Sequence, residues 1–214
     1  MVKYNLEHLI QGDDQHVVGP IQDDEALFLY SIIRGCRLKR ILEIGGLGGY
    51  SAKNFLQAIS YSEDGIVYTC DINNVPTLCD NHKVIIKNAL HITQEDLDSQ
   101  PLDLIFFDCH DTVQMDVYYR LSNLDIINDK TIIALHDTNL HYAPYLVEGE
   151  GVYYDYVEEE GGYIHQRVER EMVNTFKSLG YDIFSISTDA SKHSTEFPFR
   201  HGVTICKKFK NLII

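Results

Sequence analysis

The sequence predicts a doubly wound α/β fold, and three observations support this prediction. The chain of 214 residues is long enough for one domain with a substantial core and short for two. Hydrophobic residues make up 44% and charged residues 23%, a balance typical of globular proteins rather than disordered ones. Short, continuous apolar runs alternate with helical or polar stretches, which is the pattern of a parallel sheet covered on both faces.

The first predicted elements follow a polar segment. Residues 1–22 are mixed and polar, so we expect an N-terminal arm ahead of a single domain that spans residues 23–214. Asp23 or Asp24 can cap a helix that runs to about Arg34, because apolar residues recur there near helical spacing. A second helix is predicted from Ser51 to Ser60.

Apolar runs predict the strands of the sheet. Five of them lie in the first two thirds of the chain: Arg40–Ile44, Ile66–Cys70, Lys83–Lys87, Leu102–Phe107 and Thr131–Leu135. A helix over about 112–127 separates the last two of these strands. The remaining predicted elements are a helix over Gln166–Leu179 that ends at Gly180 and two closing strands, Tyr181–Ser187 and Val203–Lys207.

An insertion over residues 141–165 interrupts this alternation. It contains six tyrosines and six acidic residues but no Lys or Arg. Long loops in compact domains are usually functional or disordered, and the tyrosines favour a packed lid that stacks a substrate. A subunit contact is the alternative interpretation, which leaves a homo-oligomer open.

Composition excludes several classes of function. The formal net charge of −14 repels phosphate backbones, so we expect no nucleic-acid partner. No segment approaches the roughly 18 apolar residues of a membrane helix, and the start of the chain has no apolar signal-peptide core. We therefore expect a cytoplasmic protein without a membrane partner. The five cysteines show no CxxC pair, which argues against a zinc cluster or a disulfide framework.

The strongest motif is EIGGLGGYS at residues 43–51, where the first strand gives way to a helix. Glycines at this point let the backbone approach a ligand, and the helix start offers unbonded N–H groups. A dinucleotide site needs GxGxxG, but the frame that begins at Gly46 lacks the third glycine. Glu43 would also repel a pyrophosphate, whereas it suits a cationic ligand such as the methionine end of S-adenosylmethionine. A nicotinamide-dependent oxidoreductase is therefore disfavoured.

The pattern ExGxxxGYS resembles that of class I S-adenosylmethionine-dependent methyltransferases, in the version of the catechol and caffeoyl-CoA type O-methyltransferases. The segments DCHD at 108–111 and HDT at 136–138 resemble signatures of bacterial small-molecule methyltransferases. The resemblance covers roughly Gly19 to Lys207. It implies a Rossmann-like methyltransferase fold, in which a seven-stranded sheet is mostly parallel and its last strand antiparallel.

The resemblance also implies a set of cofactor-binding residues. Asp71, which closes the second strand, would bind the ribose hydroxyls, and Asn88 would meet the adenine amine. The full set for S-adenosylmethionine is Glu43, Gly45, Gly46, Gly49, Ser51, Asp71, Asn88 and Asp108.

A metal site is predicted where the fourth and fifth strands end. Asp108 and Asp137 should converge there, and two facing carboxylates repel each other unless a proton or cation intervenes. The catechol-type relatives hold magnesium at this place, so the candidate ligands are Asp108, His136 and Asp137. Because magnesium prefers oxygen, either the metal is softer, such as manganese, or His136 binds none.

The catalytic base is the least determined residue. Those relatives carry a lysine three positions after the first metal acid, and Asp111 occupies this position here. His110 is the alternative base, with Asp108 beside it. His82 is predicted to be an ordinary surface residue. The sequence thus predicts O-methylation of a small-molecule hydroxyl. N-methylation, methylation of a peptide side chain, and a catalytically silent cofactor-binding module remain as alternatives.

Overall fold

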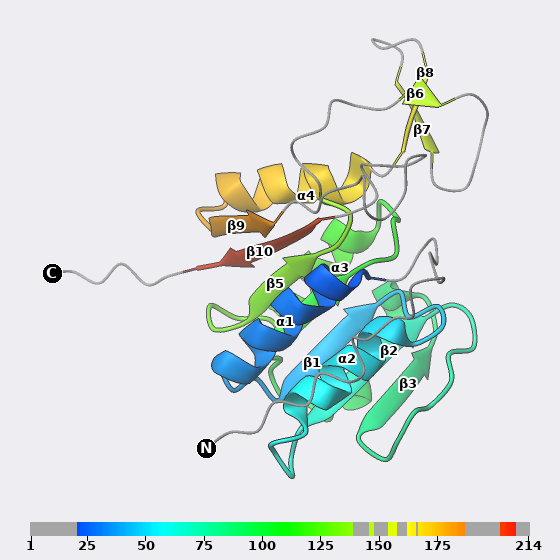
Figure 1. Ribbon diagram of the computed structural model, residues 1–214. Helices are drawn as coiled ribbons and strands as arrows, with labels where there is room; N and C mark the ends of the chain where they lie inside the picture. Colours follow the sequence, from blue (N-terminus) through cyan, green and yellow to red (C-terminus); the bar gives the residue numbers. More distant parts are fainter. Residues whose placement is uncertain are drawn as a thin grey trace, which may run out of the picture.

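A seven-stranded sheet organises the chain (Figure 1). The computed structural model describes residues 21–138, 146–147, 154–157, 162–165, 167–186 and 202–208. The strand order is β3-β2-β1-β4-β5-β10-β9, with bounds β1 Arg40–Ile44, β2 Ile66–Asp71, β3 His82–Ile86, β4 Leu104–Phe107, β5 Ile132–Leu135, β9 Asp182–Ile186 and β10 Val203–Lys207. Strands β1 to β5 pair in parallel, whereas β10 is antiparallel to both β5 and β9. This confirms the predicted fold class, including its antiparallel last strand.

Four helices cover the two faces of this sheet: α1 Asp23–Gly35, α2 Tyr50–Ile59, α3 Gln114–Asn123 and α4 Arg167–Ser178. Helices α1 and α2 pack together against one face, and α3 and α4 pack against the other (Figure 1). Neighbouring residues of β1 face opposite ways, since Ile41 packs in the core under α1 and α2 and Leu42 packs in the core under α3 and α4. Both are fully buried, as the continuous apolar runs predict.

The register of the central strands places their ends at one edge. Strand β1 lies between β2 and β4, so the chain reverses its order across the sheet at β1. Ile44 pairs with Phe107, and Phe107 pairs with Leu135. The next residues along each strand, Gly45, Asp108 and His136, therefore begin the loops at this edge. Open α/β sheets bind their ligands at such a switch point.

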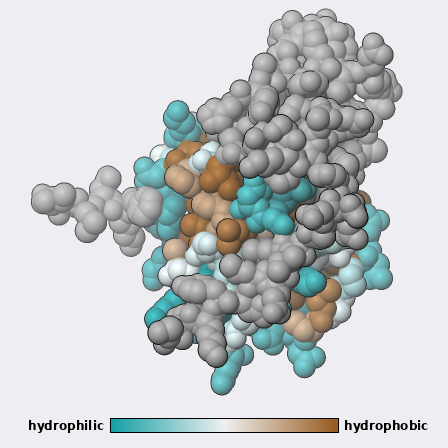
Figure 2. Space-filling model, in the orientation of Figure 1, coloured by the Kyte–Doolittle hydropathy of each residue, from teal (hydrophilic) through white to brown (hydrophobic). Residues whose placement is uncertain are grey.

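Exposed apolar side chains gather where α1 meets the edge strand β9, on the face seen in Figure 2. The rings of Phe28 and Phe184 lie 5.7 Å apart there, and Phe184 is 60% exposed. Within the described residues, no helix combines the length and the apolar character that a membrane crossing requires.

Two predicted segments lie largely outside the described residues. Residues 1–20 of the predicted arm belong to this part, so the arm stays a prediction. The insertion contributes a small antiparallel sheet that was not predicted, in the order β6-β8-β7, with β6 Leu146–Val147, β7 Tyr154–Val157 and β8 Gly162–His165. The rest of residues 141–165 lies outside the description, and their function as a lid stays a prediction.

Candidate active site

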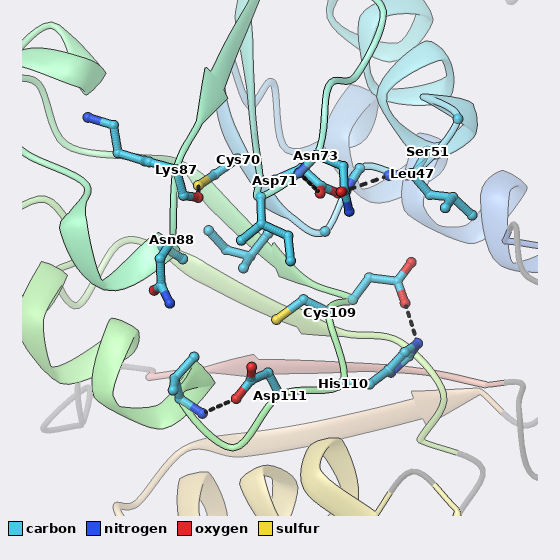
Figure 3. Close-up of a pocket in the computed structure, with 18 of the residues that line it drawn as sticks. Leu47, Ser51, Cys70, Asp71, Asn73, Lys87, Asn88, Cys109, His110 and Asp111 are labelled. Atoms are coloured by element: carbon cyan, nitrogen blue, oxygen red, sulfur yellow. Dashed lines mark hydrogen bonds and ion pairs between the residues drawn. The ribbon is translucent and has the colours of Figure 1, made fainter. Parts of the chain in front are cut away.

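A cavity of about 300 Å³ lies at the switch point, along the carboxyl ends of β1, β2 and β4. Figure 3 shows side chains around this hollow, with Asp71 and Asn88 on the side of β2 and β3 and His110 on the side of β4. Six of the predicted cofactor residues line it: Gly45, Gly46, Ser51, Asp71, Asn88 and Asp108. The other two do not line the cavity, since Glu43 lies in β1 and Gly49 directly precedes α2.

The glycine-rich loop is shaped by its contacts with the protein itself. Gly45 has a φ of +92°, and a Cβ there would lie 2.4 Å from the backbone oxygen of Asp108. A Cβ at Gly46 would lie 2.2 Å from Thr69. Asp71 holds the loop from the other side, because its Oδ2 accepts hydrogen bonds from the backbone N–H groups of Gly46 (2.8 Å) and Leu47 (3.2 Å). Larger residues at Gly45 or Gly46 would therefore displace the backbone that borders the cavity.

Beneath this loop, Glu43 is fully buried in a chain of hydrogen bonds. Its Oε1 accepts from the Ser51 hydroxyl, and its Oε2 accepts from the Thr69 hydroxyl at 2.7 Å. Burial raises the pKa of Glu43 to about 8, although both hydroxyl hydrogen bonds act in the opposite direction. The carboxyl group thus supports the cavity wall from behind.

The chain of hydrogen bonds continues from Thr69 to His82, which was predicted to be a surface residue. That prediction is wrong, because the side chain is 3% exposed. The backbone N–H of Leu78 donates to Nδ1 (3.2 Å), so Nε2 carries the proton and donates to the Thr69 hydroxyl (2.8 Å). Burial lowers the pKa of His82, which keeps the ring neutral. This order of donors leaves the Thr69 O–H for Glu43.

Two acids and a histidine converge on the opposite side of the cavity. His110 Nε2 lies 3.6 Å from Asp108 Oδ1 and 3.5 Å from Asp137 Oδ2. One ligand atom from each of the three residues lies within 4.8 Å of the others. The predicted convergence of Asp108 and Asp137 is therefore present in the fold. Burial acts to lower the pKa of His110, but the hydrogen bond with Glu169 and the charges of Asp137, Glu169 and Asp108 outweigh it and raise this pKa to about 9.

His136, the third metal ligand predicted from the sequence, also lies beside the two acids. Its Nδ1 is 2.9 Å from Asp108 Oδ1 and 3.7 Å from Asp137 Oδ1, and its Nε2 is 3.1 Å from Glu25 Oε2. Burial acts to lower the pKa of His136, but the charges of Asp108, Asp137 and Glu25 raise it well above its usual range. Because both ring nitrogens already face carboxylates, His136 bridges α1 to Asp108. His110 completes the group of three whose ligand atoms lie within 4.8 Å of one another, and metal binding by His136 stays a prediction.

Two buried acids next to these histidines were missed in the sequence. Glu25 is 0% exposed and also accepts from the backbone N–H groups of Gln22 (2.8 Å) and Gly202 (2.6 Å). Glu169 is 0% exposed on α4, and its Oε1 accepts from the side chain of Gln114 at 2.7 Å. A signal for both was present, because each stands at an apolar position of its helix. Glu25 precedes Leu29 by four residues, and Glu169 precedes Met172, Val173 and Phe176 by three, four and seven.

The chain belongs to the O-methyltransferase family, since the family model described as O-methyltransferase matches residues 5–150. No curated protein matches the chain. The family confirms the class predicted from the glycine-rich motif and the strand-end acids, an S-adenosylmethionine-dependent O-methyltransferase.

Solved structures with the same fold include three methyltransferases. The O-methyltransferase from Bacillus cereus in complex with SAH is 17% identical, with a TM-score of 0.61, and the match covers 90% of this chain and 84% of that chain. SAH-bound PaMTH1 from Podospora anserina is 17% identical, with a TM-score of 0.58 and coverages of 96% and 87%. TomG from Streptomyces achromogenes, involved in tomaymycin synthesis and in complex with SAM, is 19% identical, with a TM-score of 0.53 and coverages of 89% and 82%.

Proposed function

We propose that this O-methyltransferase acts on the hydroxyl group of a small molecule bound beside Asp108, His110 and Asp137, with a divalent cation held by these three residues. The observation that carries the proposal is the position of this cluster. Two of its members, Asp108 and His110, line the same cavity as Asp71 and Asn88, at the carboxyl ends of the central strands, and Asp137 lies behind them. One cavity can thus bring a methyl donor and an acceptor together.

The residues around the cavity fit S-adenosylmethionine. Asp71 offers carboxylate oxygens to ribose hydroxyls, and Asn88 offers an amide to the adenine. Asp108, on the other side, can accept hydrogen bonds from an ammonium group. When bound, S-adenosylmethionine supplies an electrophilic methyl carbon. The contribution of the protein is to hold the acceptor oxygen in line with that carbon and to keep it there.

The acid–histidine cluster fits a divalent cation. The gaps of 3.5 and 3.6 Å from His110 Nε2 to the two carboxylates are too long for hydrogen bonds. Ligands about 2.1 Å from a metal and at right angles lie about 3 Å apart, so a small closure of the cluster would suffice. One imidazole and two carboxylates favour manganese over magnesium. A cation here would lower the pKa of an acceptor hydroxyl.

The raised pKa of His110 bears on its predicted function as a base. With a pKa of about 9, the imidazole is protonated at neutral pH and cannot accept a proton from the acceptor. Acting alone as a base, His110 would support turnover only at alkaline pH. As a metal ligand it presents Nε2 to the cation after losing that proton, so metal binding should strengthen as the pH rises.

Turnover in the presence of a chelator tests the proposal. The full chain, labelled S-adenosylmethionine and pooled hydroxylated metabolites identify an acceptor, and the reaction is then repeated in excess chelator. We expect activity to vanish and to return with manganese, and less fully with magnesium. Full activity in chelator would remove the cation from the proposal. Transfer to amines alone would remove the hydroxyl acceptor.

A further inference from the structure

We infer that Glu169 is a positioning residue that fixes the imidazole of His110 with Nε2 turned toward Asp108 and Asp137. The functional importance of this orientation rests on the proposed function, because Nε2 is the atom offered to a cation or a proton. Its structural basis is independent of that function. It lies in the contacts of one buried carboxylate oxygen.

That oxygen, Oε1 of Glu169, accepts three hydrogen bonds. Two come from the same residue, His110, through its backbone N–H and its Nδ1, each at 3.0 Å. The third comes from Gln114 Nε2 at 2.7 Å. Glu169 and Gln114 are both 0% exposed, on α4 and α3 respectively. Glu169 is therefore held in place by α3 while it holds the loop after β4.

The carboxylate determines which nitrogen of His110 carries a proton. A carboxylate oxygen offers only lone pairs, so the Nδ1 atom at 3.0 Å must donate. Nδ1 keeps its proton in both the neutral and the charged ring, and only Nε2 can gain or lose one. Where a histidine binds a metal, an acceptor on its other nitrogen, such as a carboxylate, usually fixes the ring in this way.

Glu169 also holds the backbone of His110. This residue has a φ of +54°, in the left-handed region that residues other than glycine rarely adopt. Asp137, on the other side of the cluster, has a φ of +52°. Strained backbone of this kind persists where surrounding contacts determine it, and it gathers at active sites. The bond from the His110 N–H to Glu169 is such a contact.

A core-filling function explains Glu169 less well. Its second oxygen, Oε2, is buried and has no hydrogen-bond partner among the described residues. An apolar side chain would fill the same volume without a buried polar atom lacking a partner. The carboxylates of Asp108, Asp137 and Glu169 all face His110. Of these, Glu169 alone meets Nδ1.

The test compares Glu169→Met, Glu169→Gln and the control Glu171→Gln, an exposed position on the same helix. Two-bond ¹H–¹⁵N spectra of the full chain, above the pH at which His110 becomes neutral, report which ring nitrogen carries the proton. Comparison with His110→Asn identifies its signals. We expect Nδ1–H in wild type, in Glu169→Gln and in the control, because an amide oxygen still accepts. Glu169→Met should shift the ring toward Nε2–H.

Manganese titration of the same proteins gives the second readout. We expect affinity for Mn²⁺ to fall about 10- to 100-fold in Glu169→Met and to change by less than about threefold in Glu169→Gln. Affinity for S-adenosylmethionine should stay unchanged. The inference would be overturned if a folded Glu169→Met variant kept its proton on Nδ1 of His110. It would also be overturned if the neutral ring of the wild type carried its proton on Nε2, and this second result does not require the Met variant to fold. Absence of Mn²⁺ binding in wild type with the expected proton positions would instead contradict the proposed cation alone.

Discussion

Glu25 Oε2 lies 3.1 Å from His136 Nε2, although the two residues are 111 positions apart in the sequence. The other nitrogen of this ring is 2.9 Å from Asp108. A carboxylate at the start of α1 is thus connected through one imidazole to the acid that borders the cavity. Glu25 and His136 are almost fully buried and Asp108 is largely so, which limits the access of water to these contacts.

Removing Glu25 should destabilise the fold. Glu25→Ala leaves His136 Nε2 and two backbone N–H groups without their acceptor. Breaking a buried charged pair costs about 3–5 kcal/mol, and for a chain of this length that lowers the Tm by about 10 °C. Thermal unfolding measures this change, with the exposed Glu63→Ala as the control. Equal Tm values for the two variants would show that the Glu25–His136 contact contributes nothing to stability.

Asp71 should contribute to cofactor affinity. We expect Asp71→Asn to weaken S-adenosylmethionine binding by about 1–3 kcal/mol, because hydrogen bonds to a charged group are lost. Calorimetric titration measures this affinity. The control is Asp80→Asn, an exposed position in the segment that follows β2, which should bind S-adenosylmethionine as the wild type does. In thermal shift experiments S-adenosylmethionine should raise the Tm, whereas NAD should not. An unchanged affinity in Asp71→Asn would remove this carboxylate from the cofactor site.

Asp137 should matter for the cation more than for the cofactor. Asp137→Asn is expected to weaken Mn²⁺ binding at least tenfold and to lower kcat, since one of three ligands loses its charge. Affinity for S-adenosylmethionine should remain within about twofold of wild type. The matched control is Asp116→Asn, an exposed acid on α3. If Asp137→Asn lost cofactor binding and kept Mn²⁺ binding, the assignment of this residue would be reversed.

Glu43 should make stability depend on pH. Its pKa is about 8 in the folded protein and near 4.5 when unfolded. The unfolded chain therefore releases this proton first, and stability falls as the pH rises from 4.5 through 8. Within that window the loss is roughly 1.4 kcal/mol per pH unit. Glu43→Gln removes the titrating group. The free energy of unfolding, measured in urea at pH 6, 7 and 8, should therefore decline more steeply with pH in the wild type than in this variant. Parallel declines would show that Glu43 is ionised in the folded protein.

Much of the fold and part of the site could be predicted from the sequence. Continuous apolar runs define the central strands, because β1, β2, β4 and β5 are buried on both faces. Since parallel strands share one edge for their carboxyl ends, the residues just after them, Asp71, Asp108 and Asp137, were expected at that edge. The helical spacing of apolar residues also pointed to Glu25 and Glu169, because each occupies a position where that spacing predicts an apolar side chain. Polar residues at such positions deserve a functional interpretation.

The orientation of the two histidines could not be predicted in this way. His110 and His136 follow neighbouring strands, and sequence adjacency to an acid does not fix the direction of a ring. The left-handed backbone at residue 110 and the buried acids on α1 and α4 decide it. These acids are far away in the sequence and meet the histidines only in the folded chain. His82 was mistaken for a surface residue for a similar reason, because its partners Thr69 and Leu78 belong to β2 and a loop.

The bond from the Gly202 N–H to Glu25 has a consequence for the order of folding. It joins residues 177 positions apart, at the start of β10, a strand that enters the sheet between β5 and β9. Contacts of such long sequence separation form slowly, and in vectorial synthesis they wait for the distal segment. We expect the edge that carries Asp108 to acquire its final geometry only after β10 docks. Nascent or C-terminally truncated chains would then be able to collapse around β1 to β5 and still be incompetent for methyl transfer.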